Sequence, residues 1–439
     1  MGGEFRSKIE NNKVNEYINK VCSLIKNKKV HPEIKEELLG HINDIIEDYL
    51  EIGMSLDIAT DKALMQMGNA EVIGHDLNKA HKSNSDWILL IMTISLIFFG
   101  FLTTAFLQLN NFNDGYYINY ISKLLVFLGI SIVLSLCIIK LDYRSLKKYS
   151  LTLYIISISL ILLTLTFSLP VHGMKRWLTI GAFSIDTLAV TPILLIVSLS
   201  GIFDNYHWND KKSLFKGLTL VLIPVILFIS LPSLSTIIIY LIAAFTIMHI
   251  SGFKLKYLII ISVSLGSILL LSIFRTAYRI ERFFIFLNPS KDIDNAGWIY
   301  NQLNILRNSA GLLGSGSTIN SSVLPNANME FALTSIIYCF GWIVGIIVIA
   351  LVLSFIIRIG FISSNTKNTY GKLLVSGLCS LFTVQFILNI LANFSLSPIL
   401  GINMPFISYG GSQLVINVLS ISIINNVYKF RNVSSTFSN

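Results

Sequence analysis

The chemistry that this sequence could support depends on charged residues lying outside its long apolar runs. Nine acidic residues follow residue 86, and six of them fall in segments that we place outside a membrane: Asp114, Asp186, Glu281, Asp292, Asp294 and Glu330. The segment 275–332 also carries the basic residues Arg275, Arg279, Arg282, Lys291 and Arg307. Arginines bind pyrophosphate oxygens, and a carboxylate near the interface can take a proton from a sugar hydroxyl. This pattern favours a site for an anionic lipid-linked substrate; the alternative is a solvated loop whose arginines meet lipid headgroups.

A second unusual feature is the glycine- and proline-rich segment 398–412. Its helix-breaking residues are Gly401, Pro405, Gly410 and Gly411. These residue types do not fit inside a straight helix. A non-helical backbone at the membrane edge is tolerated only against protein or a wet cavity. We therefore expect 398–412 to line a cavity, and the alternative is a structural turn before the last apolar run.

Several classes of chemistry lack support in the sequence. No carboxylate lies in the middle of an apolar run, which argues against an ion-coupled transporter or a channel with a charged ring. No Walker A, HExxH or GxSxG motif is present. The four cysteines show no CxxC spacing, so neither a disulfide framework nor a zinc site is indicated. No basic patch with interleaved aromatics appears on a soluble segment, so no nucleic-acid partner is expected.

The composition predicts that most of the chain lies in lipid. Of its 439 residues, 53% are hydrophobic and only 13% are charged, about half the charged fraction of a soluble domain. A membrane-crossing helix needs about 20 apolar residues. We expect ten such spans, at 87–109, 118–139, 151–169, 187–203, 214–232, 234–250, 257–274, 333–357, 371–392 and 413–428. The predicted fold is therefore an all-α polytopic membrane protein.

Charge sets the expected orientation of these spans. Residues 87–439 hold 22 Lys and Arg against 9 Asp and Glu, a net charge of +13. With the N-terminus inside, every cytoplasmic connection is basic, as the positive-inside rule requires. Both termini are then cytoplasmic, 432–439 is a cytoplasmic tail, and 275–332 is a large extracytoplasmic loop between spans seven and eight. Anionic membrane lipids are expected neighbours of the basic loops.

Residues 1–86 differ from the rest of the chain and carry a net charge of −4, from 11 basic and 15 acidic residues. Apolar residues at helical spacing predict helices over about 14–26, 32–53, 55–67 and 69–81. Ser55 suits an N-cap, and Gly53 and Gly68 suit helix ends. We expect a small cytoplasmic helical module with a regulatory or docking role. It resembles the helical prefix found before some bacterial permease-like proteins.

Three motifs in 87–431 resemble the SEDS family (shape, elongation, division and sporulation), which includes FtsW, RodA and SpoVE. The run GMKRWLTIGAFS at 173–184 is similar to the family's G-x-x-R-W-x-x-x-G-x-F-S. The run YRIERFFIFLNP at 278–289 is similar to the Y-R-x-x-R-x-x-x-F-x-D/N-P that opens its large loop. The run PILGINMPFISYGGS at 398–412 is similar to P-x-x-G-x-x-x-P-F-x-S-Y-G-G-S.

This resemblance implies a peptidoglycan glycosyltransferase at the outer face of the bacterial cytoplasmic membrane, serving division, elongation or sporulation. It implies an inverting polymerisation of lipid II, in which a sugar hydroxyl attacks an anomeric carbon and undecaprenyl pyrophosphate leaves. A class B penicillin-binding transpeptidase is the implied partner, and a divalent cation such as Mg or Mn is a possible cofactor. The implied substrate-binding residues are Lys175, Arg176, Trp177, Arg279, Arg282, Pro405, Ser408, Tyr409, Gly410, Gly411 and Ser412.

The chain departs from the family pattern at the implied catalytic residue. The family's essential aspartate stands in H-T-D-F, and the matching run here is Asn328-Met-Glu330-Phe. Glu330 keeps a carboxylate with a similar unperturbed pKa, one methylene further from the backbone. The family's P-S-E is replaced by residues 187–189, Thr-Leu-Ala, and its paired glutamates by Tyr338 and Cys339. These departures fall at residues of the implied chemistry and leave the three motifs in place.

Two alternatives to a polymerase remain. A catalytically degenerate member of the family would act as a scaffold or regulator of wall synthesis, as the altered H-T-D-F motif suggests. A lipid-linked precursor flippase would use the same anionic substrate without the glycosyl transfer.

Overall fold

The computed structural model describes residues 12–26, 31–80, 85–109, 119–170, 175–180, 183–231, 233–274, 277–289 and 297–431. The chain divides into two compact units. One comprises Met1–Ser85 with Lys429–Asn439, and the other comprises Asp86–Tyr428. Each unit buries its own apolar residues.

The smaller unit is a helical domain. Its helices are α1 (Asn12–Leu24), α2 (His31–Glu51), α3 (Leu56–Met67) and α4 (Ala70–Ala80). They occupy the four segments where the sequence predicts helices. Gly53 and Gly68 both have positive φ angles, of 85° and 90°, as expected for residues that end helices. Ser55 is the N-cap of α3, but its side chain makes no capping hydrogen bond.

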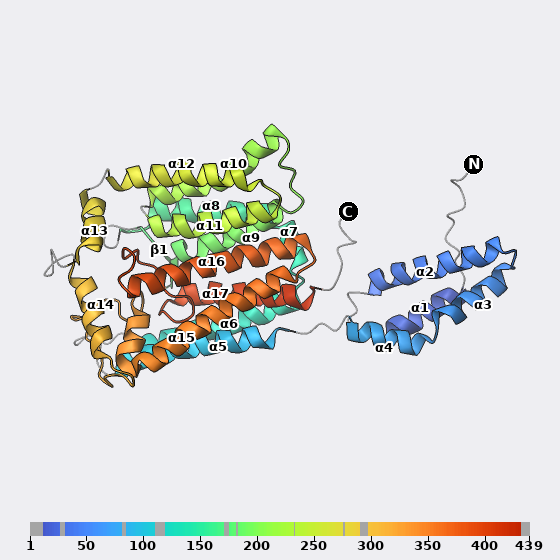
Figure 1. The fold of residues 1–439 in the computed structure, drawn as a ribbon, viewed down its shortest axis with the longest axis horizontal. Coiled ribbons are helices and arrows are strands. Elements are labelled where there is room, and N and C mark those ends of the chain that lie inside the picture. The colour runs from blue at the N-terminus through green and yellow to red at the C-terminus, as the bar shows by residue number, and fades with distance from the viewer. Residues whose placement is uncertain are drawn as a thin grey trace. The chain divides into compact units, whose positions relative to one another are not determined.

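The larger unit is a helical bundle (Figure 1). Its helices are α5 (Trp87–Leu109), α6 (Tyr120–Lys140), α7 (Arg144–Lys148), α8 (Ser150–Phe167), α9 (Thr187–Ile202), α10 (Lys211–Ser230), α11 (Leu234–Ile250), α12 (Leu255–Phe274), α13 (Ala277–Leu287), α14 (Trp298–Ser309), α15 (Ala332–Ser364), α16 (Thr369–Asn393) and α17 (Gly411–Lys429). Each predicted apolar run coincides with one helix.

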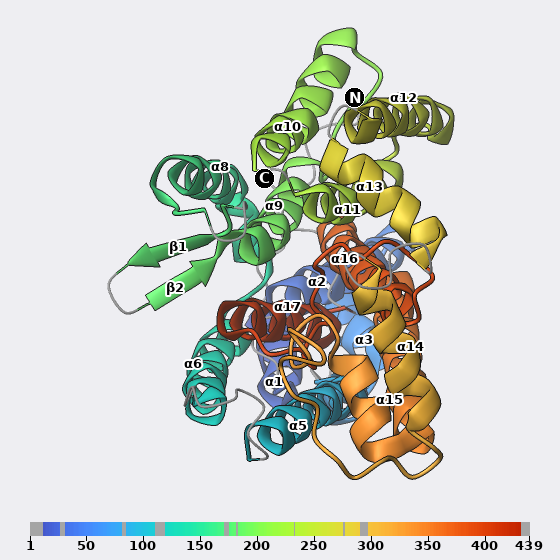
Figure 2. The ribbon, with the colours of Figure 1, turned by 90° about the vertical axis from the view of Figure 1, so that its left-hand side faces the viewer.

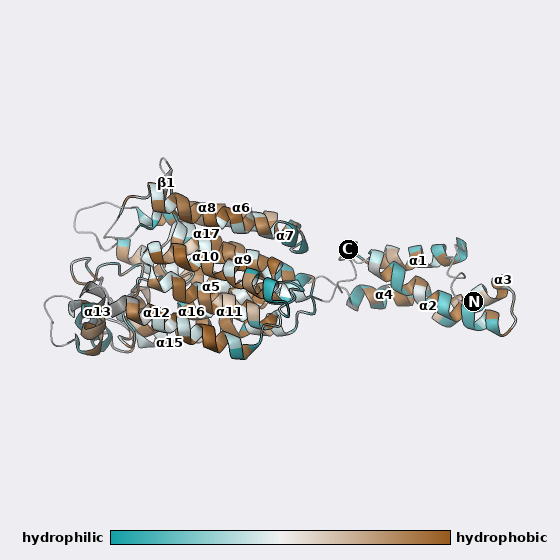
Figure 3. Cartoon of the chain, turned by 90° about the horizontal axis from the view of Figure 1, so that it is seen from above, coloured by the Kyte–Doolittle hydropathy of each residue, from teal (hydrophilic) through white to brown (hydrophobic). Residues whose placement is uncertain are grey.

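The expectation of a polytopic helical membrane protein is confirmed. Among the described residues, α5, α6, α8, α10, α15 and α16 are long and apolar enough to cross a membrane, while α9, α11 and part of α12 are apolar but shorter. The helices of the bundle are apolar along most of their length, and polar residues gather toward their ends (Figure 3). The number of spans, ten, stays a prediction.

The centre of the bundle is built around α9 and α16. Thirteen of the sixteen residues of α9 are buried, and it packs against α8, α11 and α16. In α16, 61% of the most apolar window is buried, against 11% in α6. Helices α9 and α16 therefore form the protein core, whereas α6 presents most of its apolar surface outward.

Helix α15 is broken near its start. Gly341 has φ 93° and ψ 169°, so a short half-helix of 332–340 precedes a long one of 342–364. The first N–H groups of the second half-helix find acceptors in the loop after α14. Trp342 N–H donates to the Gly311 carbonyl at 3.2 Å and Ile343 N–H to the Leu312 carbonyl at 3.3 Å. A β-carbon on Gly341 would lie 2.2 Å from the Leu312 carbonyl oxygen, so only glycine fits this junction.

One end of the bundle carries structure that the all-α prediction lacked. Strands β1 (Trp177–Ile180) and β2 (Phe183–Asp186) form an antiparallel hairpin, with Trp177 opposite Asp186. Alternating aromatic, β-branched and polar residues favour such strands, but runs of four are too short to predict. The large loop 275–332 contains α13 and α14, which lie at the same end as the hairpin (Figure 2).

Candidate active site

The β-hairpin places Arg176 and Asp186 side by side at its open end. Arg176 Nε and Nη2 each lie 2.8 Å from Asp186 Oδ2. The other carboxylate oxygen accepts the Ala189 N–H at 3.2 Å and so caps the N-terminus of α9. The side chains of this ion pair are only 16% and 10% exposed. Arg176 is therefore fixed in a shielded position, with its guanidinium also 5.5 Å from the Trp177 ring centroid.

Glu330 belongs to the same charged group. Burial alone would lower the pKa of Arg176, but the Asp186 carboxylate and the charge of Glu330 together raise it. Arg176 Nη1 also makes a long contact of 3.5 Å to the Gly401 carbonyl. A β-carbon on Gly401 would lie 3.5 Å from Glu330 Oε1, in ordinary van der Waals contact, so the carboxylate lies directly beside this glycine. The hairpin, the end of the large loop and the segment 398–412 thus converge around Glu330.

The segment 398–412 is non-helical up to Gly410, as predicted. Gly401 and Phe406 have positive φ angles of 69° and 67°. Tyr409 N–H donates to the Asn328 carbonyl at 2.8 Å, and the Ser408 hydroxyl donates to the Met329 carbonyl. The segment is therefore attached by hydrogen bonds to the residues immediately before Glu330.

Two asparagines of α16 hold the backbone of Glu330. Asn389 Nδ2 and Asn393 Nδ2 donate to the Glu330 carbonyl at 2.9 and 3.0 Å. Asn389 Nδ2 also donates to the Ile402 carbonyl at 2.7 Å, which joins the segment 398–412 to the same point. Asn393 Oδ1 accepts the Thr334 N–H at 3.1 Å. The side chain of Glu330 is thus presented from a backbone anchored on the central helix.

Arg307 has a different environment from the one the sequence suggested. We expected it among the basic residues of an outer loop, yet it is 8% exposed. Its guanidinium donates to the Asn393 carbonyl and to Asn304 Oδ1, and lies 5.2 Å from the Phe394 ring centroid. Burial lowers its pKa. Arg307 therefore joins α14 to the C-terminal end of α16, next to the asparagine that binds the Glu330 carbonyl.

The predicted substrate-binding residues divide into groups. Arg176, Ser408, Tyr409 and Ser412 lie on the segments that meet at Glu330, and Ser412 Oγ accepts the Asp186 N–H at 3.0 Å. Pro405, Gly410 and Gly411 shape the same segment, with Gly411 against the Phe127 ring. Lys175 Nζ instead donates to the Leu165 carbonyl at 2.6 Å, near the end of α8. The backbones of Arg279 and Arg282 lie in α13, but their side chains lie outside the described residues.

Three residues of the site were not predicted from the sequence. Asp186 has no assigned role among the outer carboxylates, Asn389 lies inside the predicted span 371–392, and Asn393 lies one residue beyond that span. The signal for the asparagines is their spacing of four in a span, which places two amides on one helical face. Buried amides in a membrane helix need partners, and polar groups at such depth are often functional.

The donor set of the described residues is too small to hold a metal ion without ligands from substrate or water. Among the described residues no three His, Cys, Asp or Glu side chains cluster. Asp186 is already occupied by Arg176 and by the N-terminus of α9. Mg²⁺ prefers six oxygen ligands but often takes only one or two carboxylates, with substrate phosphates and water supplying the rest. The residues present are suited to an acid–base and cation–anion site.

The fold and this site define a multi-pass helical membrane protein with a carboxylate and an arginine facing one another at one end of its bundle. The chain belongs to the FtsW/RodA/SpoVE family, whose model, described as a cell cycle protein, matches residues 85–433. The family places the protein in the bacterial inner membrane.

Individual relatives agree with this membership. The chain is 25% identical over 359 residues to the probable peptidoglycan glycosyltransferase FtsW of Trichlorobacter lovleyi, covering 78% of this chain and 92% of the relative. It is 24% identical over 361 residues to stage V sporulation protein E of Bacillus subtilis, covering 80% and 98%. A chain of a peptidoglycan synthase complex that coordinates polymerization and crosslinking has the same fold, with a TM-score of 0.66, 19% identity and coverage of 79% and 98%.

Proposed function

We propose that this protein is a peptidoglycan glycosyltransferase that polymerises lipid II at the outer face of the cytoplasmic membrane. The names of its relatives support this activity. The observation that carries the proposal is the position of Glu330, whose carboxylate lies beside Gly401 and within the field of Arg176. A base and a cation at one membrane surface are what transfer from a pyrophosphate-linked sugar requires.

In this mechanism Glu330 is the general base. Its carboxylate takes the proton of the acceptor sugar hydroxyl as the oxygen attacks the anomeric carbon of the donor. The bond from that carbon to the pyrophosphate oxygen breaks, undecaprenyl pyrophosphate leaves, and the configuration at the carbon inverts. Arg176 stabilises the negative charge that develops on the leaving group, because a fixed guanidinium needs no reorganisation during the reaction.

Arg176 has donor capacity to spare for this role. Its Nε and Nη2 groups are engaged by Asp186, whereas Nη1 makes a single long contact among the described residues, at 3.5 Å to the Gly401 carbonyl. A guanidinium has five N–H donors in a planar fork. Asp186 therefore orients the group and leaves one edge for phosphate oxygens.

The topology follows from charge. The connections assigned to the inside carry Lys140, Arg144, Lys211, Lys254 and Lys367, so both termini and the helical unit 1–86 are cytoplasmic. The hairpin, α13, α14 and Glu330 then face outward, where lipid II is polymerised. The unit 1–86 is a regulatory or docking module.

A class B penicillin-binding transpeptidase is the proposed partner. Polymerised glycan must be crosslinked, and the structurally similar chain comes from a complex that coordinates the two activities. A divalent cation, Mg or Mn, would arrive with the pyrophosphate of the substrate, because the described residues hold no cluster of three His, Cys, Asp or Glu side chains that could bind it first.

The test is lipid II polymerisation by purified protein, with the transpeptidase partner present. Wild type should form glycan chains and Glu330→Gln should form none, since the amide cannot accept the proton. Glu281→Gln is the matched control, because Glu281 is an exposed carboxylate in the same large loop and should be dispensable.

The same assay decides between the polymerase and the degenerate scaffold. The extra methylene of Glu330 relative to the family's aspartate is the observation that favours the scaffold, since a displacement of about 1 Å can cost about a hundredfold in rate. If wild type is silent and Glu330→Asp is active, the protein is a scaffold with an intact site. If both are silent while lipid II still binds, the polymerase proposal fails.

A further inference from the structure

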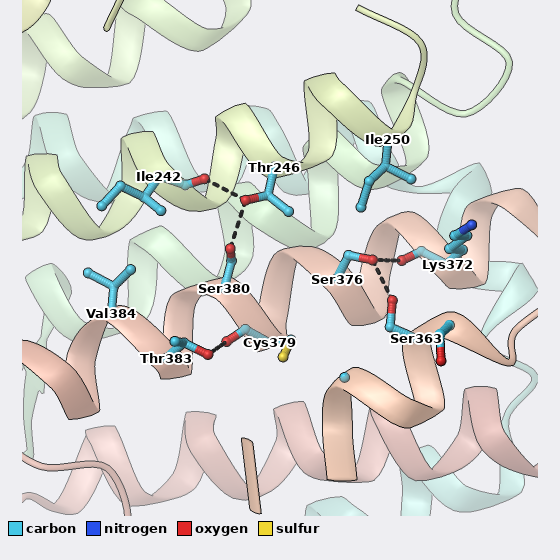
Figure 4. Close-up of a pocket in the computed structure, with 12 residues that line it drawn as sticks. Ile242, Thr246, Ile250, Ser363, Lys372, Ser376, Cys379, Ser380, Thr383 and Val384 are labelled. Carbon is cyan, nitrogen blue, oxygen red and sulfur yellow. Dashed lines mark hydrogen bonds between the residues drawn. The ribbon is translucent and has the colours of Figure 1, made fainter. Parts of the chain in front are cut away.

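A groove runs along one side of α16, on the part of the helix that precedes the asparagines bound to Glu330. Its floor is one face of α16, from Lys372 through Ser376 and Ser380 to Val384, and its cavity volume is about 490 Å³. Helix α11 forms one wall with Ile242, Thr246 and Ile250, and α15 forms the other with Gly360, Ser363 and Ser364 (Figure 4). Helix α16 packs directly against both α11 and α15, so the groove is a furrow between three membrane helices.

The groove has the length of one membrane leaflet. From Lys372 to Val384 the helix rises by about 18 Å, at about 1.5 Å per residue. The hydrocarbon core of a bilayer is about 30 Å thick, so one leaflet is about 15 Å. Lys372 lies in the first turn of α16, and Val384 lies near the middle of the helix.

The hydroxyl groups of the groove are already satisfied. Thr246 donates to the Ile242 carbonyl at 2.9 Å and is paired with Ser380 at 2.7 Å. Ser376 donates to the Lys372 carbonyl at 2.6 Å and is paired with Ser363 at 2.5 Å. The hydroxyl groups in the walls therefore already donate hydrogen bonds within the protein. An apolar ligand can lie along the groove without leaving these donors unsatisfied.

Charge is concentrated at one end of the groove. Lys372 is exposed and forms no ion pair with a carboxylate of the described residues. The opposite end is apolar, with Ile242 and Val384. A ligand that matches this polarity has an anionic head and a hydrocarbon tail about one leaflet long.

We propose that the groove is a binding site for an anionic phospholipid, with one acyl chain along α16 and the phosphate on Lys372. This assignment is independent of the glycosyltransferase proposal, because Lys372 and Asn393 stand at opposite ends of α16. The lipid would brace α11 against α15 from the side opposite to the central core.

The test measures lipids retained by the purified full-length protein, using native mass spectrometry after equilibration with equal phosphatidylglycerol and phosphatidylcholine. One lysine near a membrane surface contributes a preference of about fivefold for an anionic lipid. Wild type should retain more phosphatidylglycerol than phosphatidylcholine, and Lys372→Gln should lower that ratio about fivefold. Lys212→Gln is the matched control, a lysine in the first turn of α10, and should keep the wild-type ratio.

A second variant fills the groove without touching its charge. A β-carbon on Gly360 meets nothing within 4 Å, so Gly360→Leu should fold and should reduce retention of both lipids. A phospholipid with a photoreactive acyl chain should label the peptide containing Cys379 to Val384 in unmodified protein.

Three results would overturn the proposal. One is an equal loss of preference in Lys372→Gln and Lys212→Gln, which indicates general surface charge. Another is competition by soluble glycerol phosphate, which indicates a site for free phosphate. The third is photolabelling that avoids the groove or is unchanged in Gly360→Leu.

Discussion

Glu330 is held in position by hydrogen bonds to its backbone carbonyl, and not by bonds to its carboxylate alone. This separation predicts different effects for substitutions around it. Its carbonyl is the meeting point of two amides from α16, while its carboxylate faces Gly401 and Arg176. The groups that would take part in chemistry are therefore separate from the groups that hold them. Substitutions of the two kinds should be distinguishable, one by loss of activity and the other by loss of stability.

Arg176→Lys should reduce polymerisation with little effect on folding. Lysine keeps the positive charge beside Asp186. It lacks the planar guanidinium, which can donate to Asp186 and to a phosphate at the same time. Removal of one preorganised electrostatic donor typically costs at least about a hundredfold in kcat. Lys175→Gln is the control, since its ammonium binds the Leu165 carbonyl and not the group at Glu330. Full activity in Arg176→Lys would mean that the site needs only positive charge, and an equal loss in Lys175→Gln would argue against a specific role for Arg176.

Asn393→Leu should destabilise the protein, whereas Asn417→Leu should not. Both asparagines are 1% exposed in membrane helices. Asn393 binds Glu330 and Thr334, and its loss leaves buried partners unsatisfied at about 1–3 kcal/mol each. Neither side-chain amide atom of Asn417 has a hydrogen-bond partner among the described residues, so leucine there should be neutral or stabilising. Thermal unfolding in detergent gives both values, and a larger loss at Asn417 would contradict the assignment.

At the scale of elements, α15 differs from the other helices of the bundle because Gly341 divides it into two half-helices. The half-helix of 332–340 begins two residues after Glu330 and ends at Gly341. The first N–H groups of the long half, at Trp342 and Ile343, donate to the Gly311 and Leu312 carbonyls. The hairpin and the segment 398–412 are the other non-helical elements of the site. The short half of α15 thus belongs to the site, and the long half runs along the bundle.

Gly341→Ala should be strongly destabilising. Alanine at φ 93° is strained by about 1–3 kcal/mol, and its β-carbon would also meet the Leu312 carbonyl oxygen at 2.2 Å. Gly360→Ala, in the long half of the same helix, is the control. Its β-carbon has open space, and alanine is favoured over glycine in a helix by about 1 kcal/mol. Chemical unfolding of the two variants should therefore change in opposite directions, and similar midpoints would argue against a rigid junction at Gly341.

At the scale of the whole molecule, the chain combines a membrane bundle with a helical unit that has a separate core. Val14 and Ile18 of α1 are buried with Ile42 and Ile46 of α2. Lys13 and Asp61 add an ion pair with 2.6 Å between Nζ and Oδ1, exposed enough to contribute little. The stability of this unit therefore comes from its own apolar helix faces.

Residues 1–85 should fold when expressed alone. A domain of this size can bury enough apolar surface to be marginally stable, and its helices supply the core. Circular dichroism should show a helical spectrum and a cooperative thermal transition. Ile42→Asp, which places a charge in the core, should abolish the transition. A fragment that is helical without cooperativity would mean that the unit depends on the rest of the chain.

The elements of this fold were more predictable than the contacts of its site. Apolar runs locate the membrane helices because a helix must satisfy its own backbone in lipid. Gly53 and Gly68 mark helix ends because glycine adopts positive φ at little cost. The anchoring of Glu330 was not predictable, since Asn389 and Asn393 bind it across 59 and 63 residues of sequence. Burial of Arg307 likewise depends on contact with α16.

The break at Gly341 also determines what the thickness of the bilayer can do to this protein. An unbroken helix of 33 residues would be about 50 Å long, far longer than a hydrocarbon core of about 30 Å. Such a rod would tilt as lipids lengthen or shorten, and its end would swing. Here only the half of 342–364 has to match the membrane, while the half next to Glu330 is fixed by α14 and α16. A change in lipid chain length should therefore alter the tilt of 342–364 without moving the backbone around Glu330.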